Sequence, residues 1–332
     1  MACQGHNGLG VKNIPDFAAQ KRVLAAEGDF EALLMQCGHT QSVRQVLPSK
    51  FKVARQRVIN EWSSRPRLVD RYACVSELMF EIEDYRGALA VSRDALPHAK
   101  GTELAGWFRI QMADALKILG HFDEAEVIVR QAIRLNTKLG DPYDIAGAYN
   151  NLGVLLIEKA VPEPRRALKP LERALATLDG VDMRRGTRRR REGLMVLRGR
   201  VLNNLGLAYE GNGDLHKALE YYHRAVAVKS RIGDVLGEAK TLGNIGIVML
   251  MTGHPEAAHW RARALSIMSK YDLRRDMAYV LWRTGDLLCA RGQEGEGEVL
   301  LQRALTLYRS VDGSLFGANL VLKSLKQLGI AS

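Results

Sequence analysis

The chain has 332 residues, of which 47% are hydrophobic and nine are proline, a composition that suits a protein built mainly from helices. Its net charge of +11 is uneven, because eight arginines against two acidic residues in the segment 182–200 account for +6 of it. The remainder is only mildly basic and by itself indicates no nucleic-acid partner.

The cysteines and the apolar runs exclude several other classes. The four cysteines lie far apart and form no CxxC or Cys/His pair at metal-ligand spacing. The longest apolar run, 245–251, has seven residues, whereas a membrane-spanning helix needs about 20. No Gly-x-Ser-x-Gly, Walker or EF-hand spacing occurs. We therefore predict a soluble, cytoplasmic protein that is not an enzyme and holds no metal or cofactor.

Residues 1–66 give the weakest pattern of the chain. The segment 17–37 contains Glu27-Gly28-Asp29, which could be the turn of a degenerate helix pair, and 43–62 looks helical apart from Pro48. We interpret 1–66 as an irregular helical N-terminal region. Its part 38–62 is the one place where a small DNA-binding unit could lie, although it has no persuasive helix-turn-helix pattern.

Further along, three short segments are almost identical in sequence: 150–153, 203–206 and 243–246 read Asn-Asn-Leu-Gly, Asn-Asn-Leu-Gly and Gly-Asn-Ile-Gly. The last two begin 40 residues apart. A repeat of this period predicts a stack of similar units rather than one closed core.

The unit that begins at Leu202 shows the pattern most fully. Its apolar and small residues recur at spacings of three, four and seven, first on one helix and then on a second. Between the two helices we expect Gly213 to adopt a left-handed conformation and Asp214 to cap the second helix. Gly206 is expected to allow the two helices to approach closely. The residues of the pattern are Leu202, Leu205, Gly206, Tyr209, Gly213, Asp214, Ala218, Tyr222 and Ala225.

This pattern resembles the tetratricopeptide repeat (TPR) family. The resemblance implies an all-α fold, a right-handed superhelix in which antiparallel helix pairs form an α-solenoid. About six units cover 67–310, with an Arg-rich insertion near 182–198, and 311–332 is a C-terminal capping helix. The period of about 40 residues is similar to the repeats of Pins-type adaptors, kinesin light chains and the sensor domains of bacterial transcription regulators.

In the TPR family, the first helix of each unit lines a concave groove, and the residues two and six before its glycine point inward. Asn at such a position binds peptides in this family. A primary amide can pair with both the N–H and the C=O of an extended backbone, while cations favour acidic side chains. An alternative is that each Asn bridges neighbouring helices. The candidate peptide-binding residues are Gln111, Asn151, Arg200, Asn204, Lys240, Asn244, Tyr279 and Arg283.

The Arg-rich insertion lengthens the spacing between two units from 40 to 53 residues. It can be a solvated charged loop, an extension of the flanking helices, or a contact for an acidic partner or nucleic acid. No aromatic residues are interleaved, which argues against stacking on single-stranded bases. The arginines concerned are Arg184, Arg185, Arg188, Arg189, Arg190 and Arg191.

These patterns predict a non-enzymatic scaffold that binds an extended peptide or a partner helix in its groove. A sensor protein acting in transcriptional control is the alternative, with the Arg-rich insertion contacting an acidic partner or nucleic acid. Partner identity, oligomeric state and the role of residues 1–66 stay open.

Overall fold

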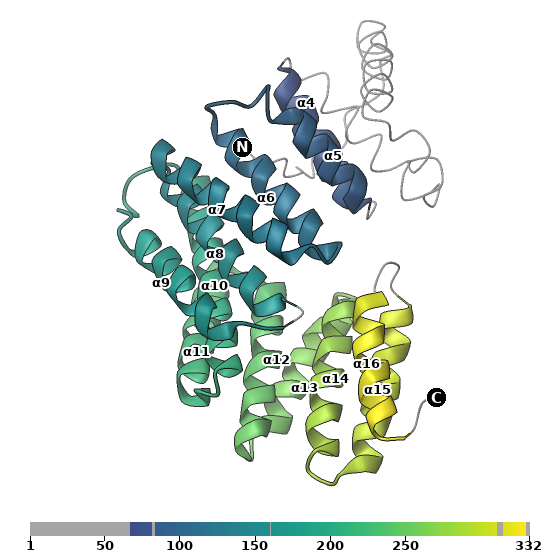
Figure 1. Ribbon diagram of the computed structural model, residues 1–332. Coiled ribbons are helices and arrows are strands. Elements are labelled where there is room, and N and C mark those ends of the chain that lie inside the picture. The colour runs from purple at the N-terminus through teal and green to yellow at the C-terminus, as the bar shows by residue number, and fades with distance from the viewer. Residues whose placement is uncertain (1–66, 82–83, 160, 311–314, 330–332) are drawn as a thin grey trace, which may run out of the picture. The chain divides into compact units, whose positions relative to one another are not determined.

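The computed structural model describes residues 67–81, 84–159, 161–310 and 315–329, which form helices and short turns without any strand (Figure 1). The N-terminal region expected in 1–66 lies outside the described residues. The chain divides into two compact units, Met1–Asp144 and Ile145–Ser332. The all-α expectation is confirmed, and none of the described helices is long and apolar enough to span a membrane.

The first unit contains two helix pairs. Its core joins Leu78 and Met79 of the first helix to Val91 of the second and Phe108 of the third, and all four are fully buried. A buried hydrogen bond of 2.9 Å between the hydroxyls of Ser76 and Ser92 crosses the first pair. The helices are α4 (Leu68–Glu81), α5 (Tyr85–Ala95), α6 (Glu103–Ile118) and α7 (Phe122–Leu139).

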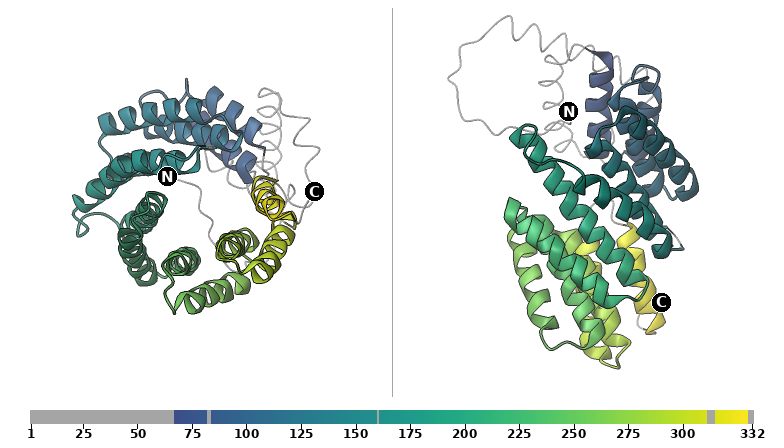
Figure 2. Two further views of the ribbon diagram at one scale, coloured as in Figure 1. Left: turned by 60° about the horizontal axis from the view of Figure 1, so that its bottom comes forward. Right: turned by 90° about the vertical axis from the view of Figure 1, so that its left-hand side faces the viewer.

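The second unit contains four further pairs and a last, single helix, and α8 enters it from the end of the first unit. Seen nearly end-on, the helices coloured green to yellow follow one another along an arc (Figure 2). These helices are α8 (Pro142–Glu158), α9 (Pro164–Asp179), α10 (Arg188–Gly211), α11 (Leu215–Ile232), α12 (Val235–Thr252), α13 (Ala257–Lys270), α14 (Arg274–Cys289), α15 (Glu294–Arg309) and α16 (Leu315–Gln327).

The pair α10 and α11 has the turn and the close helix contact that its sequence predicts. Gly213 has a φ of 81°, a conformation that side chains other than glycine rarely adopt, and the Asp214 carboxylate accepts a hydrogen bond from the backbone N–H of Lys217. A Cβ on Gly206 would overlap the fully buried ring of Tyr222. The absence of a side chain at Gly206 therefore sets how closely α10 and α11 pack.

Helix α10 is longer than its equivalents. It begins 18 residues before Gly206, whereas α8, α12 and α14 each begin 11 residues before Gly153, Gly246 and Gly285. The linker before α10, 180–187, has eight residues, while those before α8 and α12 have two. The Arg-rich insertion thus divides into about six residues of linker and seven of helix, which is two extra helical turns.

Candidate functional site

Neighbouring first helices of the second unit are joined by side-chain amides. Asn204 on α10 donates from Nδ2 to Oδ1 of Asn150 on α8 over 2.8 Å. Asn244 on α12 donates in the same way to Oδ1 of Asn203 on α10 over 3.3 Å. We call these four residues the amide ladder. In each step, the second amide of one unit donates to the first amide of the preceding unit.

The amide ladder gives Asn204 and Asn244 the bridging role that was the alternative to peptide binding. Asn244 is only 7% exposed, so little of its amide remains for a ligand, whereas Asn204 is half-buried. The carbonyl oxygen of Asn204 accepts only a long contact of 3.4 Å from Asn203. Asn204 is therefore the more accessible of the two amides to a ligand.

A buried lysine extends the amide ladder. Lys229, at the end of α11, is 4% exposed and donates from Nζ to Thr241 Oγ1 over 2.7 Å and to the Gly237 carbonyl over 3.1 Å. Thr241 in turn lies 3.0 Å from Oδ1 of Asn203. Both acceptors of Lys229 are uncharged, so no carboxylate hydrogen bond compensates its buried charge.

Burial is the main reason why the pKa of Lys229 falls from 10.5 to about 8. The charge of Asp234 opposes this decrease, while the like charges of Lys240 and Arg200 reinforce it. Cations on α10 and α12 therefore act on the ammonium group of α11 at this point of the second unit. Lys240 and Arg200 thus add positive charge near Lys229, which favours an anion, while Asp234 offsets part of this charge.

The first unit has an asparagine where the second has Lys229. Asn136 precedes Gly140 by four residues, as Lys229 precedes Gly233, and its Nδ2 donates to the Asp144 carbonyl over 3.0 Å. Its Oδ1 is buried without a hydrogen-bond partner. In α13 the corresponding residue is Met268, whose carbonyl accepts from Leu273 as that of Lys229 accepts from Asp234. Amide, ammonium and thioether thus occupy equivalent places.

A second polar group, which we call the Glu210 cluster, joins α10, α11 and α14. Glu210 accepts hydrogen bonds from Tyr222 Oη over 2.7 Å and from Arg283 Nη2 over 2.9 Å. Arg283 also donates from Nη1 to Tyr279 Oη over 3.1 Å. Glu210 is 8% exposed and Tyr222 is fully buried. The cluster thus contains two of the candidate binding residues, Tyr279 and Arg283.

The pKa values of Tyr222 and Arg283 are both raised in the Glu210 cluster. Burial raises the pKa of Tyr222, and the neighbouring Glu210 carboxylate raises it further. Burial would lower the pKa of Arg283, but the charges and hydrogen bonds of Tyr279 and Glu210 outweigh it, so the net change is upward. The arginine therefore stays charged and paired at any physiological pH.

The other candidate binding residues are more accessible. Arg200 is exposed, and no carboxylate within the described part of the chain pairs with it. Lys240 pairs with Asp276 on α14 over 3.1 Å, yet half of its side chain remains exposed. Asn151 on α8 is half-buried and makes no side-chain hydrogen bond with the described residues. Gln111, on α6, is also half-buried but belongs to the first unit.

The Arg-rich insertion is structured as well as exposed. Its first two arginines, Arg184 and Arg185, lie 3.9 and 3.4 Å from the carboxylate of Asp182. Arg188, Arg189, Arg190 and Arg191 form the first turn of α10, which Thr187 caps by accepting from the Arg190 backbone N–H. The interpretations as a loop and as a helix extension therefore each describe part of it.

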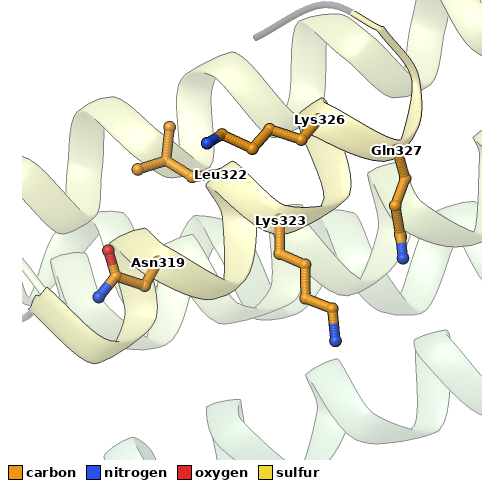
Figure 3. A pocket seen from close by; sticks show the side chains of 5 residues that line it. All are labelled: Asn319, Leu322, Lys323, Lys326 and Gln327. Atoms are coloured by element: carbon orange, nitrogen blue, oxygen red, sulfur yellow. The ribbon is translucent and has the colours of Figure 1, made fainter. Parts of the chain in front are cut away.

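The C-terminal helix α16 presents a shallow hollow of about 550 Å³ lined by residues of that helix alone (Figure 3). Lys323 and Lys326 extend away from α16 and are exposed, while Leu325 is 1% exposed. The hollow is open to solvent rather than an enclosed cavity. Among the described residues, no group of three His, Cys, Asp or Glu side chains could hold a metal ion.

Two residues of these networks, Lys229 and Glu210, were missed by the sequence interpretation. Their hydrogen-bond partners lie 8 to 73 positions away in the chain. A lysine inside an apolar stripe was the available signal for Lys229. Glu210 had no comparable signal, because it lies next to the expected turn.

Comparisons with known proteins agree with this fold. Two tetratricopeptide-repeat family descriptions match the chain, one at 108–139, within α6 and α7, and one at 197–270, from α10 to the end of α13. None of the curated proteins with which the sequence was compared matches it significantly.

Among solved structures, the apo form of RapI is similar with a TM-score of 0.62 and 12% identity, covering 85% of this chain and 98% of its own. BtubC (BKLC) from P. vanneervenii is similar with a TM-score of 0.53 and 20% identity, covering 77% of this chain and 93% of its own. At these identities the likeness shows the fold alone. The chain therefore carries tetratricopeptide repeats and has the α-solenoid fold of tetratricopeptide-repeat proteins, which generally serves as a scaffold for protein–protein interaction.

Proposed function

We propose that the second unit binds an extended peptide segment rich in acidic side chains, on the face formed by Asn151, Arg200, Asn204 and Lys240. We call this the ladder face. Its residues come from α8, α10 and α12, which the amide ladder joins side by side. Residues four apart on a helix share one face, so Arg200 lies beside Asn204.

The observation that carries the proposal is the contrast between paired and unpaired polar groups on these helices. Arg200 is exposed without a carboxylate partner, and Asn151 is half-buried without a side-chain hydrogen bond to the described residues. Amides supply the donor and acceptor that a peptide backbone needs, and the guanidinium of Arg200 suits a carboxylate. The repulsion that Lys240 and Arg200 exert on Lys229 would decrease when an acidic segment binds.

Arg283 and Asn244 contribute less to this proposal than their positions in the sequence suggested. Arg283 already pairs with Glu210, and its release would leave a buried carboxylate without a charged partner. Asn244 is 7% exposed. The proposed face therefore ends at Lys240, and α14 contributes Asp276 only as the present partner of Lys240.

Selection from a phage-displayed library of random peptides tests the proposal without knowledge of the natural partner. We expect the wild-type protein to enrich peptides that carry several Asp or Glu residues. Replacement of Asn151→Ala together with Arg200→Gln should weaken their binding at least about tenfold, since a charged hydrogen bond contributes about 1.5–3 kcal/mol. Neither change removes a hydrogen bond or an ion pair within the described part of the chain, and circular dichroism would verify folding.

The matched control replaces Arg165→Gln and Lys169→Gln, two exposed cations on α9. This variant removes one more charge than the binding variant but leaves the ladder face intact, so peptide affinity should stay within about twofold. The proposal fails if no peptide is enriched, or if the enriched peptides bind both variants equally.

Transcriptional control stays a prediction of the sequence. The segment 38–62, where a DNA-binding unit could lie, is outside the described residues. A cytoplasmic location likewise stays a prediction.

A further inference from the structure

We propose that the Arg-rich protrusion, residues 182–192, binds the phosphate backbone of duplex nucleic acid without reading its base sequence. The protrusion is the linker beside α9 together with the first turn and a half of α10 (Figure 1). It shares no residue with the ladder face. This interaction would be additional to peptide binding.

The protrusion carries a local excess of positive charge. Six arginines against Asp182 and Glu192 leave a net charge of +4 within these residues. The side chains of Arg184, Arg185 and Arg188 are 97%, 89% and 87% exposed. Their ion pairs with the two acidic residues are surface pairs, which contribute little stability and exchange readily for a stronger anion.

The helical arrangement concentrates this charge. Arg188, Arg189, Arg190 and Arg191 occupy the first turn of α10, where the positive end of the helix dipole adds to their mutual repulsion. Successive residues are about 100° apart around a helix, so these four side chains point in several directions. Such a distribution suits a partner that presents many negative charges, and a bound polyanion would relieve the repulsion.

The composition of the protrusion favours phosphates over an acidic protein. Specific protein interfaces bury an apolar core, often with aromatic residues, but positions 184–191 contain only arginine, glycine and threonine. All six cations are arginine, whose fork of donors pairs with phosphate oxygens bidentately. The lack of aromatic residues disfavours stacking on single-stranded bases. The phosphate backbone of a duplex requires no apolar core, accepts bidentate hydrogen bonds from arginine and requires no stacking on bases.

Fluorescence anisotropy of a labelled, random-sequence DNA duplex titrated with the full chain tests this proposal. If four phosphates are neutralised, the logarithm of the binding constant should fall with the logarithm of salt concentration with a slope of about −3.6. Affinity should therefore decrease about 100-fold between about 50 and 200 mM salt. A slope near zero, or no binding at the lowest salt, would overturn the proposal.

Two variants that remove the same number of charges locate the contact. Replacing Arg188, Arg189, Arg190 and Arg191 by glutamine keeps good helix formers in α10 and should weaken binding by at least about tenfold, with most of the salt slope lost. The control replaces four scattered, exposed arginines by glutamine and should change affinity by less than about threefold. These control positions are Arg165, Arg173, Arg303 and Arg309.

Equal losses in the two variants would mean that net charge alone drives binding, which overturns the proposal. Polyglutamate serves as the probe for an acidic protein partner. If it binds the wild type more tightly than the duplex does, and the glutamine variant of α10 loses that binding, the protrusion recognises carboxylates instead and the nucleic-acid assignment is wrong. Preference for a single strand over the duplex would contradict the assignment in the same way.

Discussion

The ladder face and the Glu210 cluster occupy neighbouring parts of the second unit, yet residues at equivalent positions of the repeats have different partners there. Asn204, Asn244 and Arg283 each lie two positions before the glycine of a first helix. The two amides reach only the adjacent helix, whereas the longer arginine reaches past α12 to Glu210 on α10. The length of one side chain therefore decides whether the connection reaches the preceding repeat or the repeat before that.

The two regions also differ in how far their buried charges are compensated. In the Glu210 cluster every charged group has a partner of opposite charge or a hydroxyl donor, so burial is compensated. Beside the ladder face, Lys229 is buried against uncharged hydrogen-bond acceptors, and the charge of Asp234 compensates its burial only in part. We expect the Glu210 cluster to stabilise the fold. We expect the buried Lys229 to destabilise the fold and to favour the binding of an anion nearby.

The largest effect is expected from breaking the Glu210 cluster. Arg283→Met leaves the 8%-exposed Glu210 without its charged partner and should lower the free energy of unfolding by about 3–5 kcal/mol, measured by urea denaturation. Adding Glu210→Gln to this variant should recover part of the loss. As a control, Arg263→Met removes the exposed pair with Glu238 and should cost at most about 1 kcal/mol. Similar losses for the two arginines would contradict the comparison.

Lys229→Met should have a large effect of opposite sign. Since the pKa of Lys229 is about 8 in the folded protein and 10.5 ordinarily, the unfolded chain binds more protons between these values, and wild-type stability should rise with pH across this window. Below pH 8 both states are protonated and the full penalty applies. The variant should therefore be more stable at pH 7, by up to about 3 kcal/mol.

Urea denaturation of the wild type and of Lys229→Met at a series of pH values measures this difference. Methionine is the residue that α13 carries at the equivalent position, Met268, so it fits a site of this kind. The two stability curves should converge between pH 8 and 10.5. Curves that stay parallel would show that Lys229 is not the cause of the pH dependence.

A smaller loss is expected from Gly206→Ala, since the added methyl group would overlap the Tyr222 ring that supports Glu210. Overpacking of this kind costs about 1–3 kcal/mol. Gly147, in the helical part of α8, has nothing within 4 Å of a Cβ, so Gly147→Ala should stabilise the protein by about 0.5–1 kcal/mol. Thermal unfolding followed by circular dichroism would distinguish the two, and a stabilising Gly206→Ala would contradict this account of helix packing.

The smallest effect is expected within the amide ladder. A double-mutant cycle of Asn150→Ala and Asn204→Ala should give a coupling energy of about 0.5–1.5 kcal/mol, because their hydrogen bond of 2.8 Å is lost only once. The same cycle with Asn151→Ala in place of Asn150→Ala should give a coupling within about 0.5 kcal/mol of zero. No coupling in the first cycle would show that the ladder contributes nothing to stability.

Most of the repeat pattern could be predicted from the chain alone. The left-handed Gly213, the cap at Asp214 and the contact at Gly206 each depend on residues of a single unit, and the period of 40 residues follows from comparing consecutive units. The length of the Arg-rich insertion could also be predicted, because the change in period measures it directly. The division of this insertion into linker and helix could not be predicted, since its linker part and its helical part are both rich in arginine.

The candidate binding residues show where prediction from the sequence ends. The amide pattern predicted that Asn151, Asn204 and Asn244 occupy equivalent positions, but the partners of the ladder belong to other repeats, 41 and 54 positions away. The pair of Arg283 with Glu210 spans 73 positions. Which of these amides and cations remain accessible depends on how each repeat is rotated against the next.

By itself, the sequence determined that this protein is a stack of helix pairs, where each pair turns and where arginines accumulate. Helical periodicity, capping and small-residue contacts act over a few residues or within one pair, so they can be recognised along the chain. Only the tertiary structure decided that Lys229 is buried without a carboxylate partner and that Arg283 is paired while Arg200 is not. Burial and ion pairing depend on distances between repeats, and the packing of several helices sets those distances together.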